Sequence, residues 1–380
     1  MNNIEKYSEI EDCDDEAEVS HPFDPKNIDI VTAPDTIYNI VDMIKHNDIK
    51  LDPEFQRKNV WNEKSKSRLI ESILLGIPLP MFYMAMTKDG TTEVVDGTQR
   101  LSALRDFILS PENSSFIQLT DLEFLTDLDG VTFEKLPRYH QRTIYRTNIQ
   151  ITTIRAGTPE ELKFNIFKRI NTGGMPLSPQ EIRNAIHQGK ATEFLIELTN
   201  LKSFQKVVTV SSERMQDKEL ALRIVSYLLM GYNKIITVDK FLSDGMIILN
   251  ILGGTPEKLS SSYKMPKYEN TTLDALKNQV DVSMTRAYKL FGEYAFRRSM
   301  LWDKRKSPIN KPLFDVWGYW FTKISENDFN KLVQNRDKLL PNYSNFINSD
   351  EFEQTNKHWG AQKDIDLLFR KIKEFIQMEK

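Results

Sequence analysis

The chain has 380 residues, of which 40% are hydrophobic and 28% are charged, values typical of a globular protein with more than one domain. Its single cysteine, Cys13, excludes an internal disulfide and a thiolate-rich metal site. No apolar run approaches the roughly 20 residues of a spanning helix, and the acidic N-terminus lacks the apolar core of a secretory signal, so we expect a cytoplasmic protein.

The formal net charge of −3 conceals an uneven distribution. Residues 1–20 carry eight carboxylates and one lysine, a charge of −7, which leaves +4 on the remainder. We therefore expect residues 1–28 to be an acidic, disordered leader that keeps the protein in solution. In the alternative interpretation, the leader mimics a nucleic acid and competes for the mildly basic body.

The first elements predict an α+β domain over residues 29–190. One helix follows Asp35, and a second begins after Asn62 and ends at Gly76. Two strands, 81–87 and 92–96, flank a short turn, and Gly97 separates the second strand from a helix over about 98–109.

Capping signals continue the prediction towards the C-terminus. A helix at about 137–146 leads into a strand at 149–154, and two proline-containing capping boxes begin at Thr158 and Ser178. Between them, residues 171–174 predict a tight turn with positive φ. Strand signals nearly vanish beyond residue 190, so we expect a mainly α-helical domain over 191–380.

The strongest functional signal is the strand–glycine–helix sequence from Asp96 to Arg100. The amides at the start of a helix point outward and the helix dipole adds positive charge, so an anion is favoured there. Arg100 in the first turn has the geometry to fork onto phosphate oxygens. Asp96 is placed either to orient Arg57 or to hold a divalent cation such as Mg²⁺.

A second element, Gln56-Arg57, lies in an extended segment before the second helix. If both arginines face one cavity, Arg57 and Arg100 form a clamp for two phosphates. The simpler interpretation is a structural ion pair between Arg57 and Asp96. The two interpretations are compatible, because such a pair also preorganises a site.

Residues 51–109 resemble the ParB/sulfiredoxin superfamily, and residues 35–190 with 296–317 resemble the N-terminal domain of GmrSD-type restriction endonucleases. Five ordered motifs carry this resemblance: 53–57 with Trp61, 69–80, 94–104, 167–174 and 177–185. The resemblance implies a ParB/sulfiredoxin-like fold that binds, and often hydrolyses, a nucleoside triphosphate in the service of action on foreign DNA.

By the same resemblance, the nucleotide motif maps onto Gln56, Arg57, Asp96, Gly97, Gln99 and Arg100. Thr98 departs from it, because ParB proteins place there a glutamate that helps to hold metal, and sulfiredoxin chemistry requires a cysteine there. Thr98 therefore excludes sulfiredoxin chemistry and favours nucleotide binding over metal-dependent turnover. For hydrolysis, the candidate catalytic residues are Asp96, Gln99 and Arg100, with Asp96 as the metal ligand.

Polar residues near the second capping box have two interpretations. Glycines after a helix are commonly a C-cap. The functional alternative places Asn171, Arg183 and Asn184 in the second wall of the nucleotide cleft, while Thr98 counts among the nucleotide-binding residues of the loop.

Two basic features are candidates for contact with DNA. Arg138, Arg142 and Arg146 recur at i, i+4 spacing, which gives either a solvated helix face or one that follows phosphates. The second feature, a basic segment beside Trp302, supplies a further set of candidate residues: Arg297, Arg298, Lys304, Arg305 and Lys306.

Three function classes remain open. The leading hypothesis is a nucleotide-binding protein of anti-phage defence or restriction, with an NTPase favoured over a nuclease. The five histidines are scattered, so an appended histidine-dependent nuclease is not expected, and any cutting falls to a separate nuclease or defence subunit. The alternatives are a metal-dependent DNA endonuclease that uses Asp96 and Glu181, and a non-catalytic DNA-binding module.

Overall fold

The computed structural model describes residues 10–11, 29–51, 61–87, 90–109, 118–158, 166, 178–212, 214–233, 235, 237–254 and 271–377. These form two compact units, one spanning 23–177 and the other combining 1–22 with 178–380. The chain therefore passes from the first unit to the second between Leu177 and Ser178. None of the helices described is both long and apolar enough to cross a membrane.

The first unit is built on a five-stranded mixed sheet with the order β2-β6-β4-β5-β3. Antiparallel pairs join β2 to β6 and β4 to β5, whereas β4 runs parallel to β6 and β3 runs parallel to β5. The strands are β2 (Ile30–Thr36), β3 (Ile49–Lys50), β4 (Phe82–Met86), β5 (Thr92–Asp96) and β6 (Asn148–Ile154).

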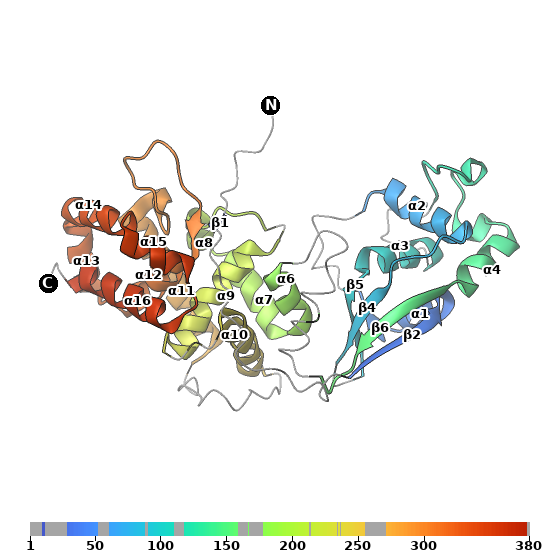
Figure 1. Ribbon diagram of the computed structural model, residues 1–380, viewed down its shortest axis with the longest axis horizontal. Helices are drawn as coiled ribbons and strands as arrows, with labels where there is room; N and C mark the ends of the chain where they lie inside the picture. Colours follow the sequence, from blue (N-terminus) through green and yellow to red (C-terminus); the bar gives the residue numbers. More distant parts are fainter. Residues whose placement is uncertain are drawn as a thin grey trace. The chain divides into compact units, whose positions relative to one another are not determined.

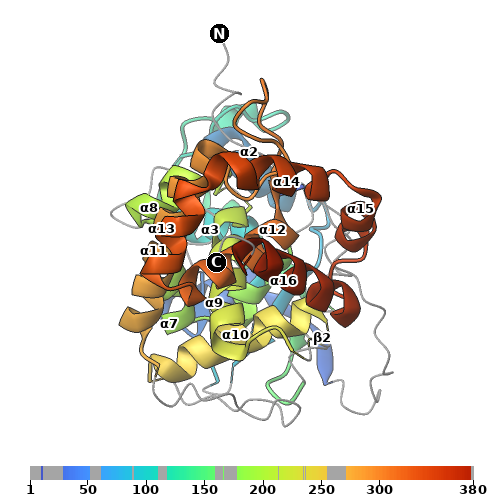
Figure 2. The ribbon, with the colours of Figure 1, turned by 90° about the vertical axis from the view of Figure 1, so that its left-hand side faces the viewer.

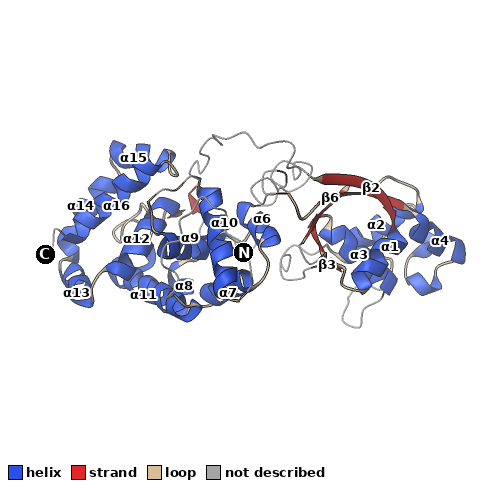
Figure 3. Ribbon diagram, turned by 90° about the horizontal axis from the view of Figure 1, so that it is seen from below, coloured by secondary structure: helices blue, strands red, loops and turns tan. Residues whose placement is uncertain are grey.

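The helices described in this unit lie on one side of its sheet, as Figure 3 shows. Their apolar faces pack with β4 and β6 into one core, in which Ile70, Phe82, Leu101 and Ile144 are fully buried. The helices are α1 (Ile37–Lys45), α2 (Glu63–Leu74), α3 (Thr98–Leu109) and α4 (Arg138–Arg146), and two short 3₁₀ turns, η3 (Thr126–Leu128) and η4 (Phe133–Lys135), precede α4.

Most predicted elements of this unit that fall on described residues are confirmed, whereas the turn over 171–174 and most of the helix predicted after Thr158 lie outside them. Asn62 caps α2 by accepting a hydrogen bond from the amide of Ser65 at 2.8 Å, and Gly76, with φ of +72°, follows the end of that helix. The strand β2 was missed by the prediction, because its side chains are mostly exposed and show no alternation.

The second unit is mainly helical, as predicted, and α12 contacts α9, α11 and α16 in its interior (Figure 2). A two-residue strand, β1 (Ile10–Glu11), pairs in parallel with β7 (Ile309–Asn310). The first helices of the second unit are α6 (Pro179–Ile186), α7 (Lys190–Thr199), α8 (Lys202–Val207), α9 (Gln216–Met230), α10 (Val238–Leu252) and α11 (Leu273–Phe291). Then follow η7 (Gly292–Tyr294), α12 (Lys311–Lys323), α13 (Glu326–Gln334), α14 (Arg336–Ile347), α15 (Asp350–Lys357) and α16 (Gln362–Gln377).

A buried charge network crosses the core of this unit. The guanidinium of Arg223 donates to Asp315 at 2.8 and 2.9 Å, and the indole of Trp359 donates to the same carboxylate at 3.0 Å. Glu219 bridges Arg223 at 3.3 Å and Lys311 at 3.1 Å. Since every charge in the network has an opposite partner, it fixes α9, α12 and the chain before α16 in one arrangement.

Candidate functional site

The predicted bend after β5 is confirmed (Figure 1). Asp96 ends the strand, Gly97 has φ of +100°, and α3 begins at Thr98. A Cβ at Gly97 would lie 2.4 Å from Cδ1 of Phe82, so only glycine fits there without displacing that ring. The bend therefore presents the first turn of α3, whose amides have no acceptor within the helix.

Arg100 holds this bend from its own first helical turn. Its guanidinium donates to the carboxylate of Asp96 at 3.0 Å, to the carbonyl of Met81 at 3.2 Å and to the carbonyl of Pro80. The same group lies 4.3 Å from the centre of the Phe82 ring. Arg100 thus ties the loop to the chain entering β4, and its charge is balanced by the Asp96 carboxylate.

The two members of this ion pair differ in exposure. The side chain of Arg100 is 11% exposed and that of Asp96 is 43% exposed. Burial lowers the pKa of Arg100, and the neighbouring Asp96 carboxylate opposes that shift. One face of Asp96 therefore remains in contact with solvent, which leaves oxygen available for a cation or a water molecule.

Gln99 connects the loop to the start of α2. Its side-chain oxygen accepts a hydrogen bond from the backbone amide of Trp61 at 3.0 Å. On the other side, β3 runs parallel to β5, so the chain leaves β3 after Lys50 at the same end of the sheet as Asp96. Gln56 and Arg57 fall between these two anchors in sequence and lie outside the described residues, as does Asn171.

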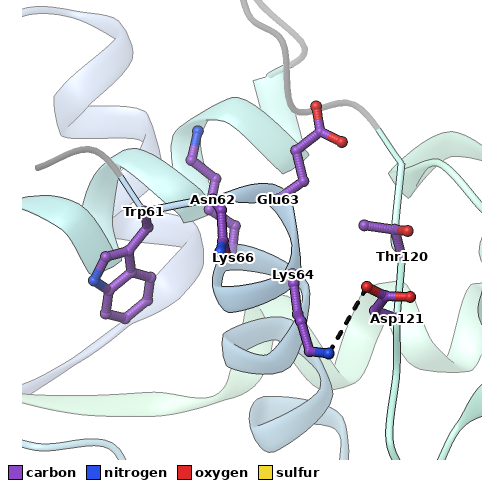
Figure 4. A pocket seen from close by; sticks show the side chains of 7 residues that line it. All are labelled: Trp61, Asn62, Glu63, Lys64, Lys66, Thr120 and Asp121. Carbon is purple, nitrogen blue, oxygen red and sulfur yellow. Dashed lines mark ion pairs between the residues drawn. The ribbon is translucent and has the colours of Figure 1, made fainter. Parts of the chain in front are cut away.

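A pocket of about 520 Å³ adjoins this connection at the start of α2 (Figure 4). Lys64 pairs across it with Asp121 at 3.8 Å, and Lys66 forms a buried ion pair with Asp106 at 3.0 Å. The seven lining residues are Trp61, Asn62, Glu63, Lys64, Lys66, Thr120 and Asp121.

The sequence analysis did not single out this pocket, although a signal was present. Lys64 and Lys66 lie near the N-terminus of α2, where the helix dipole disfavours cations. Basic residues at such a position need a local anion, which here is supplied by Asp121 and Asp106.

Arg183 and Asn184 belong to the helical unit and are buried there. Arg183 pairs with Asp239 and donates to Gln180 at 3.3 Å, while Asn184 accepts from Gln180 at 3.2 Å. These contacts give both residues a role in packing α6 within its own unit.

Glu181, the second carboxylate of the endonuclease hypothesis, closes the predicted capping box of α6. It also pairs with Arg214 at 3.1 Å. Within the described ranges, no group of three His, Cys, Asp or Glu side chains is placed to hold a metal ion.

The three arginines of α4 are all exposed, as their spacing predicted, and Arg138 donates to Gln141 at 2.8 Å. The second basic segment is divided. Arg297 is only 2% exposed and donates to backbone carbonyls, so its assignment to a DNA-contacting surface is corrected. Arg298 is partly exposed and pairs with Glu353 at 2.8 Å.

Comparison with known families bears on the sheet unit. Residues 37–188 match the family model described as GmrSD restriction endonuclease, N-terminal domain. This segment is therefore similar to the GmrSD N-terminal domain. The match covers less than half of the chain, and it includes α6 as well as the sheet unit. No curated protein matches the chain.

Proposed function

We propose that the protein binds a nucleoside triphosphate at the Gly97 loop and acts on DNA in a cytoplasmic restriction or anti-phage defence system. The match to a restriction endonuclease domain supports the role on DNA. The observation that supports nucleotide binding is the bend at Gly97. It exposes the start of α3, and Arg100 in that first turn is bonded to Asp96. The helix dipole and the unpaired amides of the first turn favour a phosphate there, while the charge of Arg100 is balanced by Asp96.

The surroundings support a ligand larger than phosphate. The pocket beside Trp61 is open to solvent and has a volume of about 520 Å³, which leaves room for more than one phosphate group. Lys64 is half-exposed at its edge and only weakly paired, so it remains available to a second phosphate. In this proposal Gln56 and Arg57, which lie outside the described residues, also bind the nucleotide.

The chemistry proposed is NTP hydrolysis in preference to DNA cleavage. The half-exposed Asp96 would hold Mg²⁺ or orient a water molecule, and Gln99 and Arg100 would fix the loop around the phosphates. Cleavage of DNA would then be carried out by a separate nuclease or defence subunit. We further propose that the sheet unit has the ParB/sulfiredoxin-like fold, which places a phosphate loop at such a strand–glycine–helix bend.

The test is a thermal-unfolding screen of the full chain with each common nucleoside triphosphate, with and without Mg²⁺. A ligand at about 100 times its dissociation constant should stabilise the protein by roughly 2.7 kcal/mol. Double replacement Arg57→Ala and Arg100→Ala should abolish the stabilisation while circular dichroism shows an intact fold. Because Arg100 also anchors the loop, Arg57→Ala and Lys64→Ala should be measured singly as well.

Arg68→Ala is the matched control, since Arg68 lies on the same helix α2 and pairs at the surface with Glu123 at 3.3 Å. It should leave nucleotide binding unchanged. Retained affinity in both the double variant and the single variants would refute this site. A competition experiment tests the alternative of a non-catalytic DNA-binding module. If the Gly97 loop bound the DNA backbone phosphate, free nucleotides would displace DNA from the protein.

A further inference from the structure

The chain between η7 and β7 forms a closed loop on the helical unit, drawn in orange in Figure 1. Its ends are joined reciprocally: the amide of Ser299 donates to Oγ of Ser307 at 3.0 Å, and the amide of Ser307 donates to Oγ of Ser299 at 2.8 Å. Inside the loop, the amide of Met300 donates to the Asp303 carboxylate at 2.6 Å, and the Tyr294 hydroxyl donates to the Asp303 carbonyl at 2.9 Å. These bonds fix the shape of the loop.

Arg297 supports this loop from within the protein. Its guanidinium donates to the carbonyl of Ser307, and its Nε donates to the carbonyl of Glu293 at 3.3 Å. Burial lowers the pKa of Arg297 to about 10, which still leaves it protonated at neutral pH. Its buried charge is therefore used to hold the two ends of the loop together.

The outer side of the loop exposes apolar groups. Trp302 is 55% exposed and Leu301 is 40% exposed, whereas Trp317 and Trp359 are at most 1% exposed. An indole held in water on a loop of fixed shape contributes nothing to the core. Exposed aromatic rings of this kind are typical of binding surfaces.

Two cations follow Trp302 closely in sequence. Lys304 and Arg305 are exposed, and no carboxylate of the described residues forms an ion pair with either. Lys306 pairs with Glu293, and the exposed Asp303 carboxylate keeps its negative charge while it accepts from the amide of Met300. The loop therefore presents an exposed indole, followed in sequence by one carboxylate and then by two cations that form no ion pair within the described residues.

We propose that the Ser299–Ser307 loop binds single-stranded nucleic acid, with the Trp302 indole stacked on an unpaired base and Lys304 and Arg305 beside its phosphates. Stacking of this kind needs a base whose face is not covered by its neighbours, as it is in a duplex. The fixed shape of the loop lowers the ordering cost of binding. The site lies in the helical unit and does not depend on a nucleotide at the Gly97 loop.

The test uses the full chain and fluorescein-labelled oligonucleotides of about 15 nucleotides, near the upper site size of a single binding module. Trp302→Ala should weaken binding of oligo-dT at least roughly tenfold, and Trp302→Phe should recover part of the loss. Lys304→Gln with Arg305→Gln should reduce the salt dependence of the affinity by roughly one phosphate contact per residue. An oligo-U arm distinguishes RNA from DNA as the source of the unpaired base.

Phe124→Ala and Lys338→Gln are the matched controls, because Phe124 is 68% exposed in the sheet unit and Lys338 is an exposed cation on α14. Both should bind like the unaltered protein. Unchanged oligonucleotide binding by Trp302→Ala overturns the proposal. Equal affinity for a duplex, with the same sensitivity to Trp302→Ala, also overturns it. Nucleotide-induced stabilisation should persist in Trp302→Ala, so this proposal and the nucleotide site fail independently.

Discussion

The side-chain oxygen of Gln99 accepts a hydrogen bond from the backbone amide of Trp61 at 3.0 Å. Through this bond, the first turn of α3 holds the chain that enters α2, and the Gly97 loop and the pocket beside Trp61 become parts of one site. The bond is polar, specific and remote in sequence, so it can be altered without touching the core.

Two replacements of Gln99 separate structure from binding. Gln99→Leu removes the acceptor and should lower the free energy of unfolding by roughly 1 kcal/mol. Gln99→Glu keeps the acceptor but adds a negative charge at the start of α3, so it should preserve stability and weaken triphosphate binding. Urea unfolding and nucleotide titration measure the two effects. Unweakened binding in Gln99→Glu would place the nucleotide away from this loop.

The bend itself is tested by Gly97→Ala. The new methyl group would meet the buried Phe82 ring at 2.4 Å, at a residue whose φ is +100°. Gly90→Ala is the matched control, because its φ is +88° and nothing lies within 4 Å of the added group. Both variants incur the cost of a left-handed residue, roughly 1–2 kcal/mol. Gly97→Ala should lose a further 1–3 kcal/mol or so by overpacking, as measured by urea unfolding. Equal losses would show that the ring yields easily.

The bend was predictable because its determinants are local. A short apolar strand, a glycine and a helix-forming stretch follow one another from Val94 to Leu104, and each acts on its neighbours in sequence. The capping box at Ser178 was predictable for the same reason, since Ser178 and Glu181 are three residues apart.

Interactions between distant residues were not predictable. The strand β2 carries Pro34 and exposed side chains, and it forms because β6, more than a hundred residues later, pairs with it along an edge. Arg297 was assigned to the surface because arginine usually lies there. In the structure its guanidinium is buried and donates to the carbonyls of Ser307 and Glu293. Sequence composition cannot show which carbonyls will surround a cation.

Glu71 should make the stability of the sheet unit depend on pH. Its buried carboxylate accepts hydrogen bonds from the amides of Glu123, Phe124 and Leu125. Burial of the carboxylate raises its pKa, but the hydrogen bonds from these amides and the charge of Arg68 lower it by more. The pKa of Glu71 therefore lies below its usual value near 4.5. Its contribution is therefore complete above about pH 4.5 and is lost as the pH falls through the folded-state pKa.

The replacement Glu71→Gln should cost roughly 1–3 kcal/mol at neutral pH and flatten the fall in stability below pH 4.5. Urea unfolding at several pH values provides the measurement. Glu123→Gln is the control, because that carboxylate is 54% exposed and its surface pair with Arg68 contributes little. A parallel pH dependence in Glu71→Gln and the unaltered protein would contradict this role.

The arginine face of α4 predicts a contact with duplex DNA. Arg138, Arg142 and Arg146 are exposed and successive turns align them. Replacing all three by glutamine should weaken duplex binding and reduce the slope of log affinity against log salt by roughly three. Fluorescence anisotropy over a salt series measures both quantities.

The control for these arginines removes the same number of charges elsewhere. Lys338, Lys363 and Lys373 are exposed on the helical unit, and their replacement by glutamine should leave the slope nearly unchanged. If both triple variants lost affinity equally, net charge alone would explain the effect and α4 would have no particular role.

The acidic leader should compete with nucleic acid for the loop that carries Trp302. Ile10 and Glu11 pair with Ile309 and Asn310, which closely follow that loop in the chain. Asp14 and Asp15 come soon after this anchor in sequence and lie outside the described residues. Asp14→Asn with Asp15→Asn should therefore tighten oligo-dT binding roughly threefold at low salt, and the gain should vanish as salt screens it.

The matched control, Asp337→Asn with Glu374→Gln, removes two exposed carboxylates from other helices and should give no comparable gain. If both pairs tightened binding equally, the leader would act through net charge alone.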